Sequence, residues 1–471
     1  MQTSNGLGAR RVFGRVIASL GLLAFLAGCG GPGAFGFLGD NSKIRIQSVP
    51  GSDQAFPSGF LWGVATAGYQ YEGGDTTSQW AAWERAKRVK HPIGPATDHW
   101  NRWEEDLDLA KGLGLNAFRL SIEWARIEPE RGRIDPEAVR HYHQVIDGLR
   151  ARGMEPIVTL VHFAYPAWLD RPLSGGEGGW ESDETVAEFR RYAAWAAQEY
   201  GPKVRWWITL NEPNTAGLTG YVAGVHPPGK RNPFVYAKVM ERMARAHQAG
   251  FEALHAHDPD AQVSINPFIF HRRQTSPTYE TQASTDLNDF SLLDRLAPVN
   301  GPDGASPTAK TDKRFLDYVA FDYYYALGIW DVTKIGTFWE WPIYPEGMYE
   351  VAKKLYERYR LPLFVAENGF ATEADNPRKD GWTREAFLVN HLAQLRKAMA
   401  EGVPVLGYMH WSLTDNYEWG SYTPKFGLYG IDRRDPELRR FRTGGAEVYR
   451  QIAIRNRLPE SLLSRYLGRR N

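Results

Sequence analysis

Cysteine is nearly absent from this chain. Only one of the 471 residues is a cysteine, Cys29, so no disulfide can form within the chain and the fold must be stabilised by its core. An excess of charge of one sign is absent as well, because 56 Lys and Arg stand against 55 Asp and Glu, a formal net charge of +1. Nothing in this balance indicates a polyanionic partner such as nucleic acid.

A long hydrophobic segment is also missing. The apolar run near the N-terminus, residues 16–27, is too short to cross a bilayer as a mature helix. Arginines between residues 10 and 15 precede it as a basic region, so residues 1–28 are predicted to be a signal peptide. The run ends in Leu-Ala-Gly-Cys at Cys29, which resembles the lipobox of bacterial lipoproteins. An ordinary secretory signal with a chance cysteine is the alternative.

Cys29 stands at the lipobox position and nowhere else does a cysteine occur, which favours lipidation. Residues 29–52 are then the lipidated cysteine and a flexible, Gly-rich tether, with more than one acyl chain for stable anchoring. Gly30 rather than aspartate follows the cysteine, which by analogy with other lipoproteins favours the outer membrane. We therefore predict an exported bacterial lipoprotein of the cell envelope, with its domain facing the periplasm or the surface.

Aromatic residues are abundant, in contrast to cysteine. The chain has 17 Trp, 23 Tyr and 22 Phe, and sugar rings stack their C–H faces on such flat apolar surfaces. For any single ring, packing in the core is the simpler interpretation.

From residue 53 to residue 458 the chain follows one rhythm, in which short apolar runs alternate with longer helical patterns, as in βα units. The candidate strands are 60–67, 115–122, 155–162, 204–211, 262–267, 317–324, 363–368 and 405–412. The candidate helices are 103–113, 136–152, 183–200, 234–257, 345–358 and 384–400. Eight such units predict an α/β fold, a single (β/α)8 TIM barrel with enlarged βα loops and an active site at the C-terminal strand ends.

Two segments depart from this rhythm. Residues 271–313 are rich in Pro, Ser, Thr and Asp and are expected to form an irregular loop over the site, with some helix at 286–295. Residues 459–471 are expected to form a C-terminal tail.

Two of the candidate strands end in a glutamate. Glu212 follows the apolar run 207–211, and Glu367 follows 363–366. An unpaired carboxylate inside a core is costly, so both side chains are expected at the mouth of a site. Two carboxylates that meet in one site suggest cleavage of a glycosidic bond.

Polar or aromatic residues lie at most of the other strand ends. In chain order they are Gln70, Arg119, His162, Asn211, 322–324 and Trp411. Singly, each has a structural interpretation, such as an ion pair, a core histidine or a packing residue. Together, so many polar and aromatic residues at the strand ends would destabilise the fold unless they bind a ligand.

These motifs together resemble glycoside hydrolase family 1, the β-glucosidase and β-galactosidase family, from Phe56 to about Arg450. The matching segments are 60–66 with Gln70 and Glu72, 118–124, 209–213, 367–369 and 411–419. The resemblance implies an exo-acting enzyme that retains anomeric configuration by double displacement, with Glu367 as nucleophile and Glu212 as acid/base, about 5 to 5.5 Å apart. Arg119 and Tyr324 would hold Glu367 ionised, while the Glu367 charge keeps the proton on Glu212.

The resemblance also implies a site for the nonreducing sugar. Its hydroxyls would bond to Gln70, His162, Asn211, Glu418 and Trp419, with Asn211 on the 2-hydroxyl and Trp411 as the stacking floor. A carboxylate at Glu418 would repel a 6-phosphate, so an unphosphorylated β-glucoside, or a related galactoside or fucoside, is expected. Neither a cofactor nor a metal is expected, since His141 and His143 look like surface residues on different faces of a helix.

Three departures from the family pattern bear on sugar preference. Ala164 stands where an aspartate is common, Asp322 stands where asparagine is usual, and residues 420–426 differ from the commonest ending. Asp322 is an extra carboxyl group that could perturb proton sharing between Glu212 and Glu367. A transglycosylase on the same fold and a catalytically weak surface glycan-binding protein stay as alternatives, and the oligomeric state is left open.

Overall fold

The computed structural model describes residues 55–171, 173–269, 271–272, 290–299, 313–327 and 337–469. The predicted signal peptide, Cys29, the tether and most of the predicted loop 271–313 lie outside the described residues. Within the described ranges, no helix is both long enough and apolar enough to cross a bilayer.

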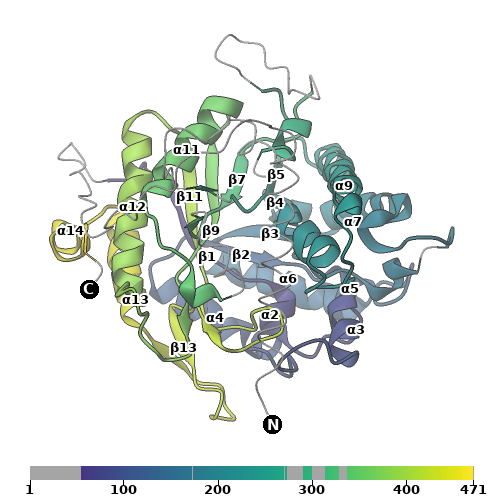
Figure 1. The fold of residues 1–471 in the computed structure, drawn as a ribbon, viewed down its shortest axis with the longest axis horizontal. Helices are drawn as coiled ribbons and strands as arrows, with labels where there is room; N and C mark the ends of the chain where they lie inside the picture. Colours follow the sequence, from purple (N-terminus) through teal and green to yellow (C-terminus); the bar gives the residue numbers. More distant parts are fainter. Residues whose placement is uncertain are drawn as a thin grey trace, which may run out of the picture.

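Eight parallel strands form the centre of the molecule (Figure 1). They are β1 (Leu61–Ala65), β2 (Ala117–Ser121), β3 (Glu155–Val161), β4 (Trp206–Asn211), β5 (Gln262–Asn266), β7 (Val319–Asp322), β9 (Leu363–Asn368) and β11 (Val405–Trp411). Their order in the sheet is β5-β4-β3-β2-β1-β11-β9-β7. Each strand lies within a predicted range, so the predicted barrel is confirmed.

The two outer strands, β5 and β7, meet through side-chain and backbone contacts that nearly close the barrel. The Ser264 hydroxyl donates to the Tyr318 carbonyl at 2.8 Å and accepts from the Ala320 amide at 3.0 Å. At the C-terminal end of β7, Asp322 forms a parallel β-bridge with Phe268, which follows β5. A serine side chain thus supplies bonds that a continuous ladder would make with backbone groups.

Helices surround the strands (Figure 1). The longer ones are α4 (His99–Gly112), α6 (Pro136–Ala151), α7 (Asp183–Tyr200), α9 (Tyr236–His257), α11 (Glu346–Tyr359), α12 (Arg384–Ala400) and α13 (Gly444–Arg455). The shorter ones are α2 (Gly68–Glu72), α3 (Gln79–Arg85), α5 (Trp124–Ile127), α8 (Pro213–Gly217) and α14 (Glu460–Tyr466). Side-chain caps fix several starts: Asp135 accepts from the Glu137 amide before α6, and Thr383 accepts from the Ala386 amide before α12.

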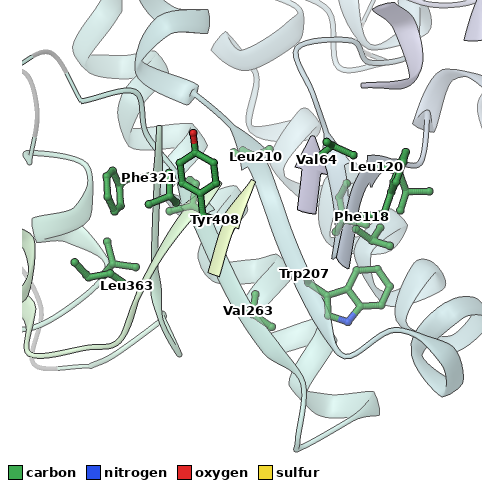
Figure 2. Close-up of a cluster of buried hydrophobic side chains, with 14 of the residues drawn as sticks. Val64, Phe118, Leu120, Trp207, Leu210, Val263, Phe321, Leu363 and Tyr408 are labelled. Carbon is green, nitrogen blue, oxygen red and sulfur yellow. The ribbon is translucent and has the colours of Figure 1, made fainter. Parts of the chain in front are cut away.

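The alternation of side chains along the strands divides the core into two layers. On β2, Ala117 belongs to the cluster inside the barrel, whereas Phe118 and Leu120 belong to the cluster between strands and helices. Figure 2 shows part of this outer cluster, with Val64, Phe118, Leu120, Trp207, Leu210, Val263, Phe321, Leu363 and Tyr408 labelled. Each large side chain buried there stabilises the fold by about 1.5–3 kcal/mol, which keeps the strand ends in fixed positions.

The end of the chain is folded rather than a free tail. Leu462 of α14 is buried. Asn390 of α12 donates to the Tyr466 carbonyl at 2.9 Å and accepts from the Gly468 amide at 2.9 Å. The residues from 459 to 469 are therefore attached to the barrel.

The surface position predicted for His141 is wrong. Only 8% of His141 is exposed, its ring stacks on Trp100 at 3.7 Å between centroids, and burial lowers its pKa to about 4. His143 is half-buried, and its Nε2 lies 2.7 Å from Glu199 Oε1. The helical pattern did not reveal that Trp100, from another helix, covers His141.

Candidate active site

Glu212 follows β4 directly and precedes the short helix α8. Its backbone lies in the left-handed region, with φ of +38° and ψ of 55°, which costs an L residue on the order of 1 kcal/mol. The Glu212 amide donates to the Asn266 carbonyl at 2.8 Å, and Pro213 opens α8 without needing an amide partner. This sharp turn stops the strand and leaves the carboxyl group, 7% exposed, at the strand ends.

Glu367 lies near the end of β9, where the chain passes close to β11. The next residue, Asn368, donates to the Tyr323 carbonyl at 2.5 Å and accepts from the Tyr408 hydroxyl at 2.7 Å. A side chain at Gly369 would place its Cβ 2.1 Å from the Trp411 carbonyl oxygen. Glycine therefore allows the strand ends that carry Glu367 and Trp411 to approach each other.

Arg119, fully buried on β2, is the cation at the centre of the site. Its Nη1 donates to Glu367 Oε1 at 2.6 Å, its Nη2 donates to Asn211 Oδ1 at 2.6 Å, and its Nε donates to Thr159 Oγ1 at 3.0 Å. The Tyr324 hydroxyl donates to the other Glu367 oxygen at 2.7 Å. Glu367 is thus bonded on both oxygens by groups that favour its ionised form.

Three carboxyl groups meet at this point. Glu212, Glu367 and Asp322 each have a carboxyl oxygen within 4.8 Å of the others. Asp322, at the end of β7, has no exposed area. The sequence predicted the first two as a pair and Asp322 as an extra carboxyl group that could perturb them, and the structure places Asp322 beside both.

The three carboxyl groups differ in how readily they lose their protons. Burial raises the pKa of all three. For Glu212 burial and the Glu367 charge raise the pKa to about 8. For Asp322 burial and the charges of Glu367 and Glu212 raise the pKa well above its usual range. For Glu367, Arg119 and the Tyr324 hydroxyl act against the rise. Glu367 is therefore the group that ionises first, while Glu212 and Asp322 keep their protons.

A second set of predicted residues lies beside this centre. Gln70 Nε2 donates to Asn416 Oδ1 and the Tyr417 carbonyl, both at 3.0 Å, and to Glu418 Oε2 at 3.3 Å. Gln70 Oε1 is buried and has no hydrogen-bond partner among the described residues. Burial, more than the Glu367 charge, raises the pKa of Glu418 to about 7. Acceptor groups of Gln70 and Glu418 are thus available to ligand hydroxyls.

The hydrogen bonds fix the tautomer of His162. Asn211 Oδ1 accepts from Arg119 and from Asn266 Nδ2 at 2.8 Å, so Asn211 Nδ2 faces His162 Nε2 at 3.1 Å. Nε2 must then accept, which places the His162 proton on Nδ1, a buried atom with no protein partner among the described residues. Burial and the Arg119 charge lower the His162 pKa well below its usual value, so the ring stays neutral.

Aromatic rings line the same place. The His162 ring stacks near Trp411 at 5.7 Å and near Trp419 at 5.9 Å between centroids. Trp411 Nε1 donates to Glu418 Oε1 at 3.0 Å, and Trp419 stacks on Tyr69 at 6.1 Å. All ten residues predicted for catalysis or sugar binding therefore lie around one end of the barrel.

The departures from the family pattern differ in their surroundings. Ala164 is buried in an aromatic cluster with Tyr69, Trp80 and Tyr417, so packing replaces the bonds an aspartate would make. Residues 420–426 include β12 (Pro424–Lys425), which pairs with β10 (Thr372–Glu373). Asp322 lies in the carboxyl cluster itself.

Sequence reasoning missed Asn266, the last residue of β5. Asn266 Nδ2 donates to Asn211 Oδ1 at 2.8 Å and to Asp322 Oδ2 at 2.6 Å. It therefore links the strand end of Glu212 to that of Asp322. The signal was an asparagine near the end of the predicted strand 262–267, in the place that Asn211 takes at the end of the predicted strand 204–211.

A (β/α)8 barrel with two facing glutamates at its C-terminal end, one of them held by arginine and tyrosine, defines an enzyme that acts on glycosidic bonds. The chain belongs to glycosyl hydrolase family 1, whose model matches residues 52–297 and 300–458. It is a glycoside hydrolase.

Named relatives align over most of the chain. Beta-glucosidase A of Thermotoga maritima is 32% identical over 80% of this chain and 93% of the relative. A beta-glucosidase of Agrobacterium sp. is 31% identical over 80% of this chain and 91% of the relative. A beta-galactosidase of Sulfolobus acidocaldarius is 29% identical over 87% of this chain and 97% of the relative.

Solved structures agree with the fold. The family 1 β-glucosidase of Thermotoga maritima in complex with isofagomine lactam superposes with a TM-score of 0.76, at 31% identity, over 86% of this chain and 100% of that one. A beta-glycosidase from Pyrococcus horikoshii gives a TM-score of 0.76 at 30% identity, over 88% of this chain and 98% of that one.

Proposed function

We propose that this protein is an exo-acting β-glycosidase that hydrolyses unphosphorylated β-glucosides, or related galactosides and fucosides, with retention of configuration. The observation that carries the proposal is the short separation of Glu212 from Glu367, the glutamate that is paired with Arg119. One carboxyl oxygen of Glu212 lies within 4.8 Å of one of Glu367, which fits carboxyl groups about 5–5.5 Å apart, as in retaining enzymes, better than the separation of about 6.5–9.5 Å that inverting enzymes need for a water molecule. The short separation supports direct attack by one of them.

The charge partners assign the roles. Glu367, held by Arg119 and Tyr324, is the carboxylate that attacks the anomeric carbon. Glu212, with a pKa raised to about 8 by burial and by the Glu367 charge, donates its proton to the leaving oxygen. Once the glycosyl–Glu367 bond has formed, the Glu367 charge is gone, and the Glu212 carboxylate can accept a proton from the attacking water.

The substrate class follows from the groups beside the glutamates. Gln70 Oε1 and His162 Nδ1 are buried polar atoms without protein partners among the described residues, so sugar hydroxyls satisfy them. Glu418 would oppose a phosphate at the same position. The names of the relatives, β-glucosidases and β-galactosidases, agree with this choice.

The stereochemical outcome tests this proposal. The domain from residue 30 onward, incubated with phenyl β-glucoside, β-galactoside and β-fucoside, is expected to release the β-anomer first, as followed by proton NMR before mutarotation. Release of the α-anomer would contradict retention. Transfer of the sugar to an alcohol acceptor in preference to water would assign the transglycosylase, and binding of sugar without turnover would assign the glycan-binding protein.

We further propose that residues 1–28 direct export and that Cys29 carries the lipid anchor in the cell envelope. The full chain, expressed in a bacterial host fed with alkyne-tagged palmitate, is expected to carry the label and to sediment with membranes. Cys29→Ala should lose the label. An unlabelled wild-type chain in the soluble exported fraction would contradict lipidation.

A further inference from the structure

Asp322 is a buried carboxyl group that the proposed double displacement does not use. Its Oδ2 accepts from Asn266 Nδ2 at 2.6 Å. Its Oδ1 is buried and makes no hydrogen bond of standard geometry among the described residues. A buried polar oxygen without a hydrogen-bond partner destabilises the fold. We therefore expect Asp322 Oδ1 to take part in a hydrogen bond in the working enzyme.

The charges around Asp322 do not balance a second anion. The titratable and charged groups that face it are Glu212 just after β4, Glu367 from β9, Arg119 from β2 and Tyr324 just after its own strand. Arg119 is paired with Glu367 at 2.6 Å. Among the described residues, neither Glu212 nor Asp322 forms an ion pair. One guanidinium therefore compensates one carboxylate, and the other two carboxyl groups are most stable with their protons.

We propose that Asp322 is a positioning residue for Glu212: it stays protonated and donates its O–H to a Glu212 oxygen. The inference rests on the proposed role of Glu212 as acid/base. The bond holds the Glu212 carboxyl group in one orientation, so that the Glu212 proton faces the glycosidic oxygen. After Glu212 has given that proton away, the same bond stabilises the Glu212 carboxylate that activates water.

The effects on protonation agree with this arrangement. Burial, with the charges of Glu367 and Glu212, raises the pKa of Asp322 well above its usual range, and Arg119 and Asn266 do not cancel the rise. Asp322 in turn lowers the pKa of Glu212 through a side-chain hydrogen bond. Asp322 Oδ1 makes no bond of standard geometry among the described residues. Oxygens of the two carboxyl groups lie within 4.8 Å of each other, so Asp322 and Glu212 are direct neighbours.

Substrates with different leaving groups separate this role from a structural one. A phenyl β-glucoside needs protonation of its leaving oxygen, whereas a 2,4-dinitrophenyl β-glucoside leaves without it. Asp322→Ala is expected to lower kcat/KM for the phenyl substrate by about 10²-fold and for the dinitrophenyl substrate by less than about threefold. Asp322→Asn, whose amide also donates, is expected to recover most of the loss.

A substitution at Asp317 serves as a control for general loosening of the fold. Asp317, before β7 and at the opposite end of the barrel, accepts from the Val263 amide at 2.8 Å. Asp317→Ala should change both substrates alike. Equal losses on both substrates in Asp322→Ala would make Asp322 a structural residue and overturn the inference. If Glu212→Gln itself shows no dependence on the leaving group, the proposed function fails instead.

Infrared spectroscopy tests the proton directly and does not depend on activity. With carbon-13 aspartate in the protein, the wild-type minus Asp322→Asn difference spectrum at pH 7 is expected to contain the carbonyl stretch of a protonated carboxyl group. A carboxylate band in its place would overturn the inference, even if Asp322→Ala does not fold.

Discussion

Replacing Glu367 with glutamine is expected to reduce kcat on every β-glycoside by more than about 10⁴-fold, as removal of a nucleophile does in enzymes that form covalent intermediates. The amide fills the same space and can still accept from the Tyr324 hydroxyl, but it cannot attack the anomeric carbon. It also leaves the buried Arg119 guanidinium without its anion. The measurement is the initial rate on a 4-nitrophenyl β-glucoside at pH 6, beside Glu373→Gln, an exposed glutamate on the nearby β10.

A variant with a smaller side chain at the same position tests the role of Glu367 through a gain of activity rather than a loss. Glu367→Gly opens space for azide beside the anomeric carbon, and a single displacement of an activated β-glycoside is expected to yield the α-glycosyl azide. Glu373→Gln should behave as the wild type. Residual activity of Glu367→Gln above about one tenth of the wild type, with the glutamine verified by mass spectrometry, would exclude Glu367 as the nucleophile.

The sequence predicts the barrel well because the strand signal is local. Each strand is an apolar run bounded by turn residues, and the run 363–368 coincides with the observed β9. Strand ends are also local, so Glu212 and Glu367 are visible as carboxylates that interrupt buried segments. The barrel closure is not visible in this way, because it depends on contacts between distant segments, such as the bond from the Ser264 hydroxyl to the Tyr318 carbonyl.

Contacts between distant segments account for what the sequence missed. His141 looks exposed in a helical pattern, yet Trp100 covers it. Asn266 looks like an ordinary strand end, yet it connects Asn211 to Asp322. The sequence predicts the extra carboxyl group at 322, but its protonation depends on Arg119, the one cation that acts on it among the described residues, being paired with Glu367. Such properties belong to the three-dimensional arrangement and not to any one segment.

The division of labour among the three carboxyl groups follows from their partners rather than from their residue type. Glu367 has a guanidinium and a phenolic hydroxyl, Glu212 faces the Glu367 charge with no ion pair among the described residues, and Asp322 is bonded to a neutral amide. In the described part of the chain, the Arg119 charge thus selects one anion and leaves two acids. The same principle operates wherever titratable groups share one buried site.

Replacing Glu212 with glycine is expected to slow a phenyl β-glucoside by about 10²–10⁴-fold in kcat/KM, because the leaving oxygen loses its proton donor. A 2,4-dinitrophenyl β-glucoside, which needs no proton, should form the glycosyl–Glu367 intermediate readily and then accumulate it, since no base activates water. Steady-state and burst kinetics measure the two effects. Azide, entering the space of the missing carboxylate, is expected to restore turnover and to give the β-glycosyl azide, the opposite anomer to that from Glu367→Gly.

The pH profile gives an independent reading of the same group. Only protonated Glu212 can serve as the acid, and its pKa is raised to about 8 by burial and the Glu367 charge. In the wild type kcat/KM is therefore expected to fall as the pH rises through about 8, and on the acid side to fall as Glu367 takes up its proton. Glu212→Gln should lose the alkaline fall and keep the acid one. An alkaline fall that persists unchanged in Glu212→Gln would assign the proton donor to another group, and Asp322, the remaining acid of the cluster, would be the next residue to substitute.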